Sequence, residues 1–420
     1  MNILLQQVSI ADPNSPFNGS KKDILIADGI IKAIEDNIST ASAQIINKEN
    51  AIVTPGWVDI FSHACDPGYE YRETIETCVE AAAAGGFTQL FTLPDTNPVV
   101  DNKAQVEYIK QKAAGLNIRV HPLGTVSKKR EGKELAEMFD MRESGAIAFT
   151  DGLQPVQNAG LFLKALQYVK SFNGVVIQLP QDKSINPSGL MNEGVISTRM
   201  GLQAVPSIAE ELIIARDIEL LQYTGSALHI TGITTQKSVE LIKAAKSKGF
   251  NITCSVTPYH LFFCDEDLVN YNTDLKVNPP LRTRADMMAL RAAVMNGDID
   301  CIASHHLPQV WDDKTCEFEY AKPGMISLQT AYAAVQTVLP ELSSSQIAAL
   351  FSTNARKIFG LNDGSININN AAEFTFFNTE AYIFNKEKNK SKSQNSPFIN
   401  LTLQGNVFGI FSKGKLILNN

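Results

Sequence analysis

The chain has 420 residues, of which 44% are hydrophobic and 19% are charged, and its formal net charge is −7. This length is enough for a large buried core and predicts one large domain together with a smaller one. The acidic balance argues against a nucleic-acid partner. No apolar run reaches the length of a membrane span, so we expect no membrane partner either.

The first segment, residues 1–7, carries no basic side chain, which argues against a secretory signal peptide. The six cysteines lie scattered, without a C-x-x-C pair or a dense framework: Cys65, Cys78, Cys254, Cys264, Cys301 and Cys316. This pattern is typical of reduced thiols, so we expect a cytoplasmic protein.

Both ends of the chain have the pattern of short β-strands. Residues 22–34 alternate apolar and polar side chains on either side of Asp28-Gly29, which predicts a hairpin. Residues 407–418 return to this pattern. We therefore predict a small β-sandwich domain built from residues 1–52 and 365–420.

A polar stretch, residues 385–393, interrupts the C-terminal part of this domain. Its composition predicts a solvated loop. Because no aromatic side chains interleave with its charges, it does not favour nucleic-acid binding.

Between the two ends, residues 53–364 alternate apolar strand patterns with helical patterns such as 76–84 and 238–245, each followed by glycine. This alternation predicts a (β/α)8 barrel of the TIM type, an α/β fold whose chemistry lies at the carboxyl ends of its strands. The eight candidate strands are residues 58–61, 89–93, 119–122, 146–149, 175–178, 227–230, 252–256 and 300–303.

The first candidate strand leads into Asp59-Ile60-Phe61-Ser62-His63. It resembles the Asp-x-His-x-His strand of the amidohydrolase superfamily, in which two imidazoles two residues apart face one metal ion. Here Phe61 stands at the first histidine position, and its ring has no lone pair to donate.

The chain as a whole resembles the dihydroorotases, over stretches that follow the family's order along nearly its full length. These stretches are residues 55–59, 73–77, 94–98, 148–152, 192–194, 276–282, 323–330 and 395–398. The resemblance implies the barrel and flanking β-sandwich, a place in pyrimidine biosynthesis, and the reversible hydrolysis of dihydroorotate to N-carbamoyl-aspartate. It also implies a divalent ion, usually zinc, that activates water near neutral pH.

The ligand positions that the resemblance implies are largely replaced. Beyond Phe61, Leu179 and Gly232 stand where histidines are expected after the fifth and sixth strands, and His305 replaces the aspartate of the eighth strand. Only His63 and Asp151 are retained from the ligand set. We therefore expect no metal and no confident catalytic residue, with Phe61 and Leu179 filling the space of the missing imidazoles.

The substrate positions are altered as well. Cys65 stands where the family's carboxylate-binding arginine belongs, and Asp95 replaces an asparagine, which places an anion against an anionic substrate. Asn278 is retained as a candidate substrate contact, and Asp95 is a weaker one.

Each remaining side chain has a second interpretation. His63 is either a hydrogen-bonded remnant or a ligand, and Asp151 either caps a turn or lines the pocket. His63, Asp151 and His305 could form a rebuilt metal site, but His305 and His306 are adjacent on a strand and face opposite sides. Cys65 beside His63 could act as a nucleophile, although no third orienting group is readable.

Three functions are compatible with these residues. The first, which we favour, is a non-catalytic dihydroorotase-like protein, a pseudoenzyme that acts as a structural or regulatory partner. The resemblance implies aspartate transcarbamoylase as the partner and a homodimer as the assembly. The second is an active hydrolase with a reduced zinc site, and the third is a small-molecule binding protein.

Overall fold

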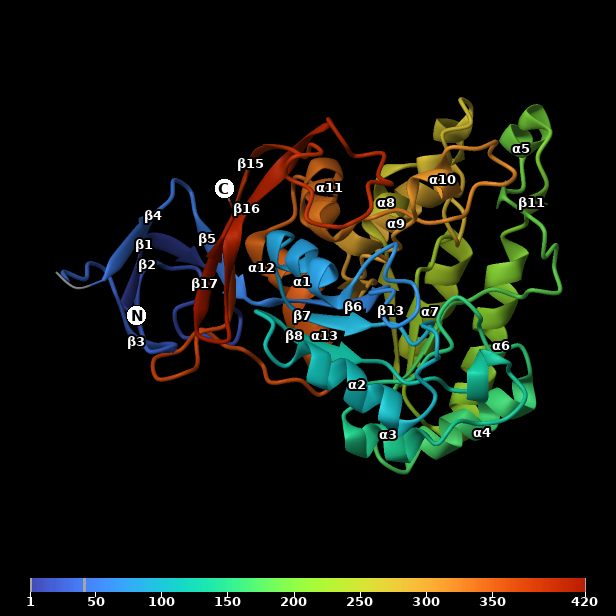
Figure 1. The fold of residues 1–420 in the computed structure, drawn as a ribbon, viewed down its shortest axis with the longest axis horizontal. Helices are drawn as coiled ribbons and strands as arrows, with labels where there is room; N and C mark the ends of the chain where they lie inside the picture. The colour runs from blue at the N-terminus through green and yellow to red at the C-terminus, as the bar shows by residue number, and fades with distance from the viewer. Residues whose placement is uncertain (1, 41–42, 420) are drawn as a thin grey trace.

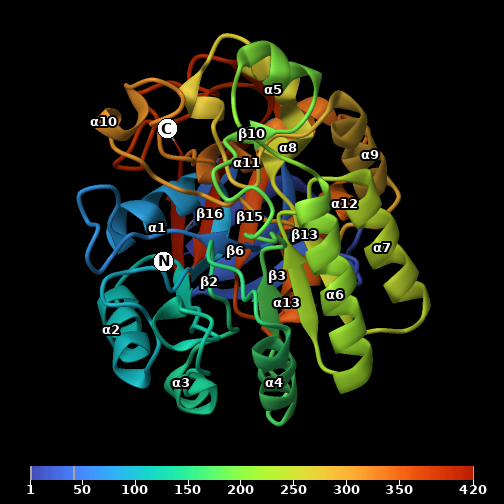
Figure 2. The same cartoon turned by 90° about the vertical axis from the view of Figure 1, so that its right-hand side faces the viewer.

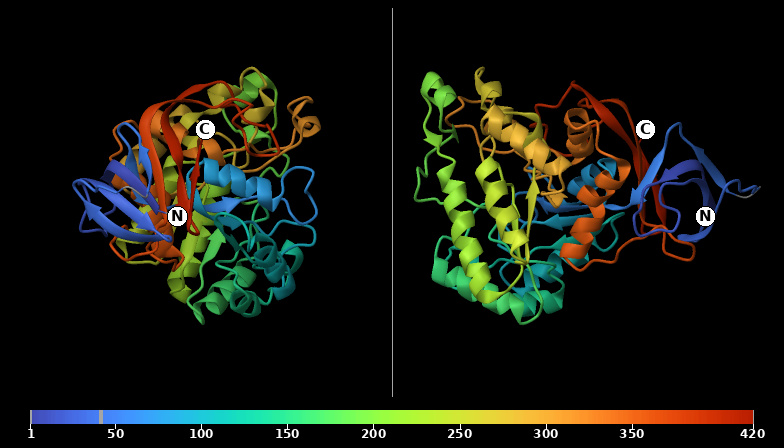
Figure 3. Two further views of the ribbon diagram at one scale, coloured as in Figure 1. Left: turned by 60° about the vertical axis from the view of Figure 1, so that its left-hand side comes forward. Right: turned by 180° about the vertical axis from the view of Figure 1, so that it is seen from behind.

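The computed structural model describes residues 2–40 and 43–419, which form a barrel of strands and helices with a β-rich lobe at one side (Figure 1). The two chain ends lie together in this lobe (Figure 3). Its strands are β1 (Asn2–Ile10), β2 (Lys21–Ala27), β3 (Ile30–Glu35), β4 (Gln44–Asn47), β5 (Ile52–Pro55), β15 (Phe374–Ile383), β16 (Thr402–Ser412) and β17 (Lys415–Leu418).

One sheet in the described part of the chain joins the strands of both ends. Its order is β17-β16-β15-β5-β1-β2-β3, with β4 pairing β1. Strand β15 makes the junction, because Phe374 pairs with Pro55 of β5 on one side and with Phe411 of β16 on the other. Isoleucines of β1–β3 and phenylalanines of β15 and β16 fill the core of the lobe. The hairpin predicted over residues 22–34 is confirmed as β2 and β3.

The barrel strands are parallel and form a ring. Strands β6, β7 and β8 pair in order, and β9, β12, β13 and β14 form a second run. A bridge at Phe149 joins β9 to Gly124 just beyond β8, and a bridge between Ser62 and His306 closes the ring from β14 to β6. These strands are β6 (Trp57–Ser62), β7 (Phe87–Thr92), β8 (Arg119–Pro122), β9 (Val176–Gln178), β12 (Leu228–Thr231), β13 (Ile252–Val256) and β14 (Cys301–Ile302).

The predicted strand 146–149 is present only as the bridge at Phe149. Backbone hydrogen bonds nevertheless hold it in the ring, since Phe149 N donates to Val175 O and Ile177 N donates to Phe149 O. Among the described residues, seven strands and this extended segment complete the barrel. The predicted (β/α)8 fold with a β-lobe from both chain ends is confirmed.

Helices surround the ring of strands (Figure 2). The predicted helices 76–84 and 238–245 are confirmed as α1 and α7, which begin after the capping side chains of Thr74 and Thr235. The α-helices are α1 (Ile75–Ala84), α2 (Lys103–Ala113), α3 (Met138–Ser144), α4 (Ala159–Lys170), α5 (Val195–Met200), α6 (Ile208–Thr224), α7 (Gln236–Ser247), α8 (Pro258–Phe262), α9 (Arg284–Met295), α10 (Trp311–Lys314), α11 (Ala331–Val338), α12 (Ser344–Ala348) and α13 (Asn354–Ile358).

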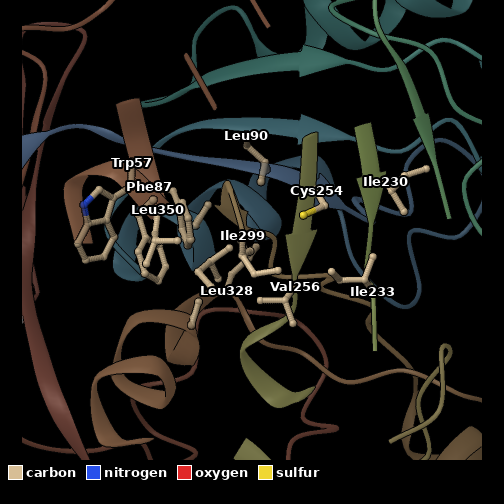
Figure 4. Packing of buried hydrophobic residues seen from close by; sticks show 14 of the residues in the cluster. Trp57, Phe87, Leu90, Ile230, Ile233, Cys254, Val256, Ile299, Leu328 and Leu350 are labelled. Carbon is tan, nitrogen blue, oxygen red and sulfur yellow. The ribbon is translucent and has the colours of Figure 1, made fainter. Parts of the chain in front are cut away.

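The main core lies between the strands and these helices (Figure 4). Trp57 is fully buried there, with its ring 4.9 Å from that of Phe351, and Figure 4 shows it beside Phe87. Both faces of the barrel strands are buried, which explains why their sequences are continuous apolar runs. The carboxylate of Glu373, next to β15, binds Arg356 of α13 and so joins the lobe to the barrel.

The prediction of a solvated loop over residues 385–393 is partly wrong. Lys386 and Lys388 are exposed, but Ser391 and Ser393 are buried. Their hydroxyls donate to the Glu73 carboxylate and to a backbone carbonyl. Residues 385–393, called the strap below, are therefore hydrogen-bonded to the loop after β6. No helix within residues 2–40 and 43–419 is long and apolar enough to cross a membrane.

Candidate functional site

The candidate site lies at the carboxyl ends of β6 and β14, which the bridge between Ser62 and His306 makes neighbours. Phe61 on β6 is fully buried, and its ring stacks on that of His305, with 4.3 Å between centroids and 28° between planes. The two positions expected to hold metal ligands on these strands therefore contact each other instead.

His63 pairs with Asp95 in the loop after β7. Its Nδ1 donates to Asp95 Oδ2 across 2.8 Å, and the backbone N–H of His63 donates to the carbonyl of His306. Burial alone would raise the pKa of Asp95, but the His63 imidazole and then Arg130 hold it below its usual value. The carboxylate of Asp95 is therefore engaged by the imidazole of His63 rather than left to repel a ligand.

His305 is held on the other side of the site. Its Nε2 lies 2.7 Å from Thr231 Oγ1, while its Nδ1 is buried without a hydrogen-bond partner among the described residues. Burial, and then the neighbouring imidazoles led by His260, lowers the pKa of His305 well below its usual value, so the ring is neutral at pH 7.

Gly232 and Leu179 complete the packing around His305. A Cβ on Gly232 would lie 2.6 Å from His305 Cε1 and 3.3 Å from Leu179 Cδ1, and its backbone has a φ of +67°. A side chain larger than hydrogen does not fit there while His305 keeps this position. Leu179 is fully buried. The positions after the fifth and sixth strands, where histidines were expected, are thus occupied by packed groups.

Asp151 is turned toward a neighbouring loop. Its carboxylate accepts hydrogen bonds from the backbone N–H groups of Val126 and Ser127, at 2.9 and 3.0 Å, and from the Ser127 hydroxyl. Burial raises the pKa of Asp151, and these hydrogen bonds oppose that shift. The side chain thus fixes the turn that follows β8, rather than the turn that comes directly after Asp151 in the chain.

His306 contacts other partners than His305 does, but not for the strand alternation expected from the sequence: β14 ends at Ile302, and His305 has a left-handed backbone with a φ of +46°. The Nδ1 of His306 accepts from the backbone N–H of Ser327, and its Nε2 lies 3.4 Å from Glu73 Oε2. Burial alone would raise the pKa of Glu73, but His306 and the hydroxyl of Ser391 hold it below its usual value. His306 therefore belongs to a buried network outside the site.

The remaining candidates are structural or peripheral. Cys65 is buried, and burial followed by the charge of Asp95 raises the pKa of its thiol, which disfavours a nucleophilic thiolate. Asn278 is half-buried, with its Nδ2 3.4 Å from Gln181 Oε1. His229 and His260 are buried and bonded to hydroxyl groups of β13 and of the turn that follows it, and burial lowers the pKa of each to about 3.

Comparison with known proteins agrees with this architecture. A family model described as dihydro-orotase-like matches residues 50–238. The dihydroorotase of Acetivibrio thermocellus is 40% identical over 421 residues, with 99% of each chain covered, and that of Aquifex aeolicus is 37% identical with the same coverage. The chain belongs to the dihydroorotase family. An L-hydantoinase from Arthrobacter aurescens shares the fold, with a TM-score of 0.85 at 21% identity over 99% of this chain and 97% of that one.

Dihydroorotase-family membership raises the question of whether the donors present fit a zinc ion. Zinc needs three or more nitrogen, oxygen or sulfur donors at about 2.0–2.3 Å around one point. Among residues 2–40 and 43–419, no three His, Cys, Asp or Glu side chains are placed to hold a metal. His63, Asp151 and His305 each point at a different partner, so this donor set does not fit the ion.

Two partners in this dihydroorotase-like site are not identified by the sequence. The residue pattern makes Asp95 a weak substrate contact rather than the partner of His63, and it places Glu73 only within a matching stretch. Asp95 directly follows a largely apolar strand, which is a signal that could have pointed to buried pairing, whereas Glu73 stands in a polar stretch and has no such local signal.

Proposed function

We propose that this chain is a non-catalytic member of the dihydroorotase family that acts through its surfaces in pyrimidine biosynthesis. The observation that carries the proposal is the stack of Phe61 on His305 beside Gly232 and Leu179. These side chains occupy the volume that converging ligands would need, and the contacts among them are those of a packed core.

The chemistry of the retained polar groups supports the same conclusion. Amide hydrolysis near neutral pH needs an activated water and a polarised carbonyl, which a metal ion supplies in related reactions. His63 is bonded to Asp95 through Nδ1, and the Asp151 carboxylate accepts three hydrogen bonds from a neighbouring loop. The His305 ring is neutral and stacks on Phe61.

The partner that we propose is aspartate transcarbamoylase, and the assembly within which the two associate contains a homodimer of this chain. This part rests on the family resemblance. A protein that acts only through its surfaces needs a stable barrel and does not need side chains that bind a metal. Apolar side chains at the former ligand positions avoid the cost of burying polar groups that have no partner.

An active dihydroorotase is the second candidate. It is favoured by the full-length relatives at about 40% identity, whose name is dihydroorotase. For this function, His305 must leave Phe61 and converge with His63 and Asp151 on one ion, which requires breaking the three sets of contacts described above.

The deciding experiment measures metal content and dihydroorotate hydrolysis on the same sample, purified without chelator and assayed with and without added zinc. An active dihydroorotase serves as the positive control. The proposal predicts substoichiometric metal and no turnover. One or two ions per chain with turnover that His63→Ala abolishes would replace it with the second candidate.

The partner is tested separately, by size-exclusion chromatography of the chain alone and mixed with aspartate transcarbamoylase of the same organism. We expect co-elution at a mass above that of either protein. Two unshifted peaks across a range of concentrations and salt would contradict the partner, while leaving the proposal on catalysis to the first experiment.

A further inference from the structure

A cavity of about 590 Å³ opens beside the candidate site, within the range of roughly 300–1,000 Å³ typical of small-molecule sites. Its walls come from loops that follow β6, β13 and β14, from the strap at residues 385–393, and from residues 394–399 that follow it. These three strands are neighbours in the ring, so the cavity lies on the face where TIM barrels bind ligands. Figure 2 shows α10, one of its walls, at the rim of this face.

Two aromatic side chains on the walls are unusually exposed. Trp311, the first residue of α10, is 74% exposed, and Tyr71 in the loop after β6 is 54% exposed. Large aromatic rings normally bury most of their surface, and they offer flat faces on which another ring can stack. The Arg72 guanidinium already lies 5.4 Å from the centroid of the Tyr71 ring, so Trp311 provides most of the stacking surface that the chain leaves uncovered.

Three lysines also line the cavity: Lys314, Lys386 and Lys392. Among the described residues, none of them forms an ion pair within 4.0 Å. The ammonium of Lys314 donates to two backbone carbonyls, and that of Lys392 donates to the carbonyl of Glu70. One acid, Asp274, lines the same wall; burial raises its pKa against the opposing charge of Lys314, and burial also lowers the pKa of Lys314 to about 8. The walls thus carry excess positive charge.

A polar group on the wall is left without a partner. Gln309 is buried, and its Nε2 donates to the carbonyl of Pro323 at 2.8 Å, yet its Oε1 accepts no hydrogen bond within the described residues. Buried carbonyl oxygens are nearly always paired. An N–H donor that reached this oxygen would satisfy it.

We propose that this cavity binds a nucleoside monophosphate. The base stacks on Trp311 and Tyr71, a ring or exocyclic N–H of the base donates to Gln309, and the phosphate lies against Lys386 and Lys392. The ligand class follows from three complementary features of one cavity: flat aromatic faces, an unsatisfied acceptor and unpaired cations. This site is separate from the packed His63 and His305 region and requires no turnover there.

Tryptophan fluorescence tests the proposal, because the chain has two tryptophans and Trp57 is fully buried. Quenching at the red edge of the emission therefore reports Trp311. Each of the four common nucleoside monophosphates is titrated, with the matching nucleoside and inorganic phosphate as separate arms. We expect saturable quenching by at least one monophosphate below about 1 mM, weaker quenching by its nucleoside, and none by phosphate alone.

Variants on the strap provide a matched comparison. Lys392→Gln removes a cation from this cavity, whereas Lys390→Gln changes an exposed lysine two residues away that lines a different cavity. We expect Lys392→Gln to weaken binding about tenfold and Lys390→Gln to leave it unchanged. Trp311→Phe, followed by calorimetry instead of fluorescence, should retain binding because the ring is conserved.

Three results would overturn the proposal. They are the absence of saturable quenching by any monophosphate, equal losses in the Lys392→Gln and Lys390→Gln variants, and quenching by phosphate alone that matches that of the nucleotides. Turnover of dihydroorotate is not measured in these titrations, so their failure leaves the proposed function untouched.

Discussion

Replacing Gly232 by alanine tests whether His305 fills the site as the structure indicates. The new Cβ would lie 2.6 Å from His305 Cε1, so the imidazole must move. Movement weakens the contact with Thr231, worth about 0.5–1.5 kcal/mol, and the stack on Phe61, worth a similar amount. The left-handed backbone adds about 1–2 kcal/mol for any L side chain.

We therefore expect Gly232→Ala to lower the free energy of unfolding by roughly 2–5 kcal/mol, from the sum of these three contributions. Gly201→Ala is the matched control, because Gly201 has a φ of +69° and an added Cβ there would meet nothing within 4 Å. It should lose only the backbone contribution of about 1–2 kcal/mol. Both are measured by equilibrium urea unfolding followed by circular dichroism.

A double-mutant cycle with His305→Ala isolates the crowding. In the His305→Ala background, Gly232→Ala should cost no more than Gly201→Ala, because the clashing ring is gone. Equal costs for the two glycine variants in the parent chain would refute the packing described here and would reopen the space for a histidine ligand.

Three further predictions concern the metal site and the response to pH. Phe61→His alone should not bind stoichiometric zinc by elemental analysis, because the other ligand positions stay closed; stoichiometric uptake would contradict this. Glu373 has its pKa lowered to about 2, since Arg356 and Arg119 outweigh burial. Its contribution of about 3 kcal/mol is present above pH 4.5 and lost as pH falls toward 2, so Glu373→Gln should lower Tm much more at pH 7 than at pH 3. Burial raises the pKa of Asp217 to about 7, so its ionisation costs stability as pH rises from about 4 to 7. Asp217→Asn should raise Tm at pH 8 and leave it unchanged at pH 4, and a gain of equal size at both would refute the assignment.

The sequence was sufficient for the strands and helices of the barrel because their patterns are local. Seven of the eight predicted strands occur as strands, and the segment at Phe149 is held by isolated bridges to Gly124, just beyond β8, and to Val176 of β9. No local pattern could distinguish a strand from such a bridge, since the difference lies in the number of paired residues.

The strap at residues 385–393 is a second case in which the local sequence does not predict the structure. Its composition is that of an exposed loop, and its lysines are exposed. Ser391 is buried only because Glu73, more than 300 residues earlier in the chain, lies beneath it and accepts its hydroxyl. A small polar side chain is buried or exposed according to whether a hydrogen-bond partner is present, and its identity alone does not decide this.

The sequence by itself determined the family, the barrel and the loss of ligand-type side chains at Phe61, Leu179 and Gly232, because residue identity decides whether a lone pair is available. Strand alternation predicted that His305 and His306 face opposite sides, but that argument does not apply here, because both lie beyond β14 and His305 has a left-handed backbone with a φ of +46°. Only the tertiary structure decided that His63 pairs with Asp95 and that His305 occupies the space above Gly232. Those outcomes depend on side chains from different strands meeting at one end of a closed barrel. The number of residues between two side chains in the sequence does not tell how far apart they lie in that barrel.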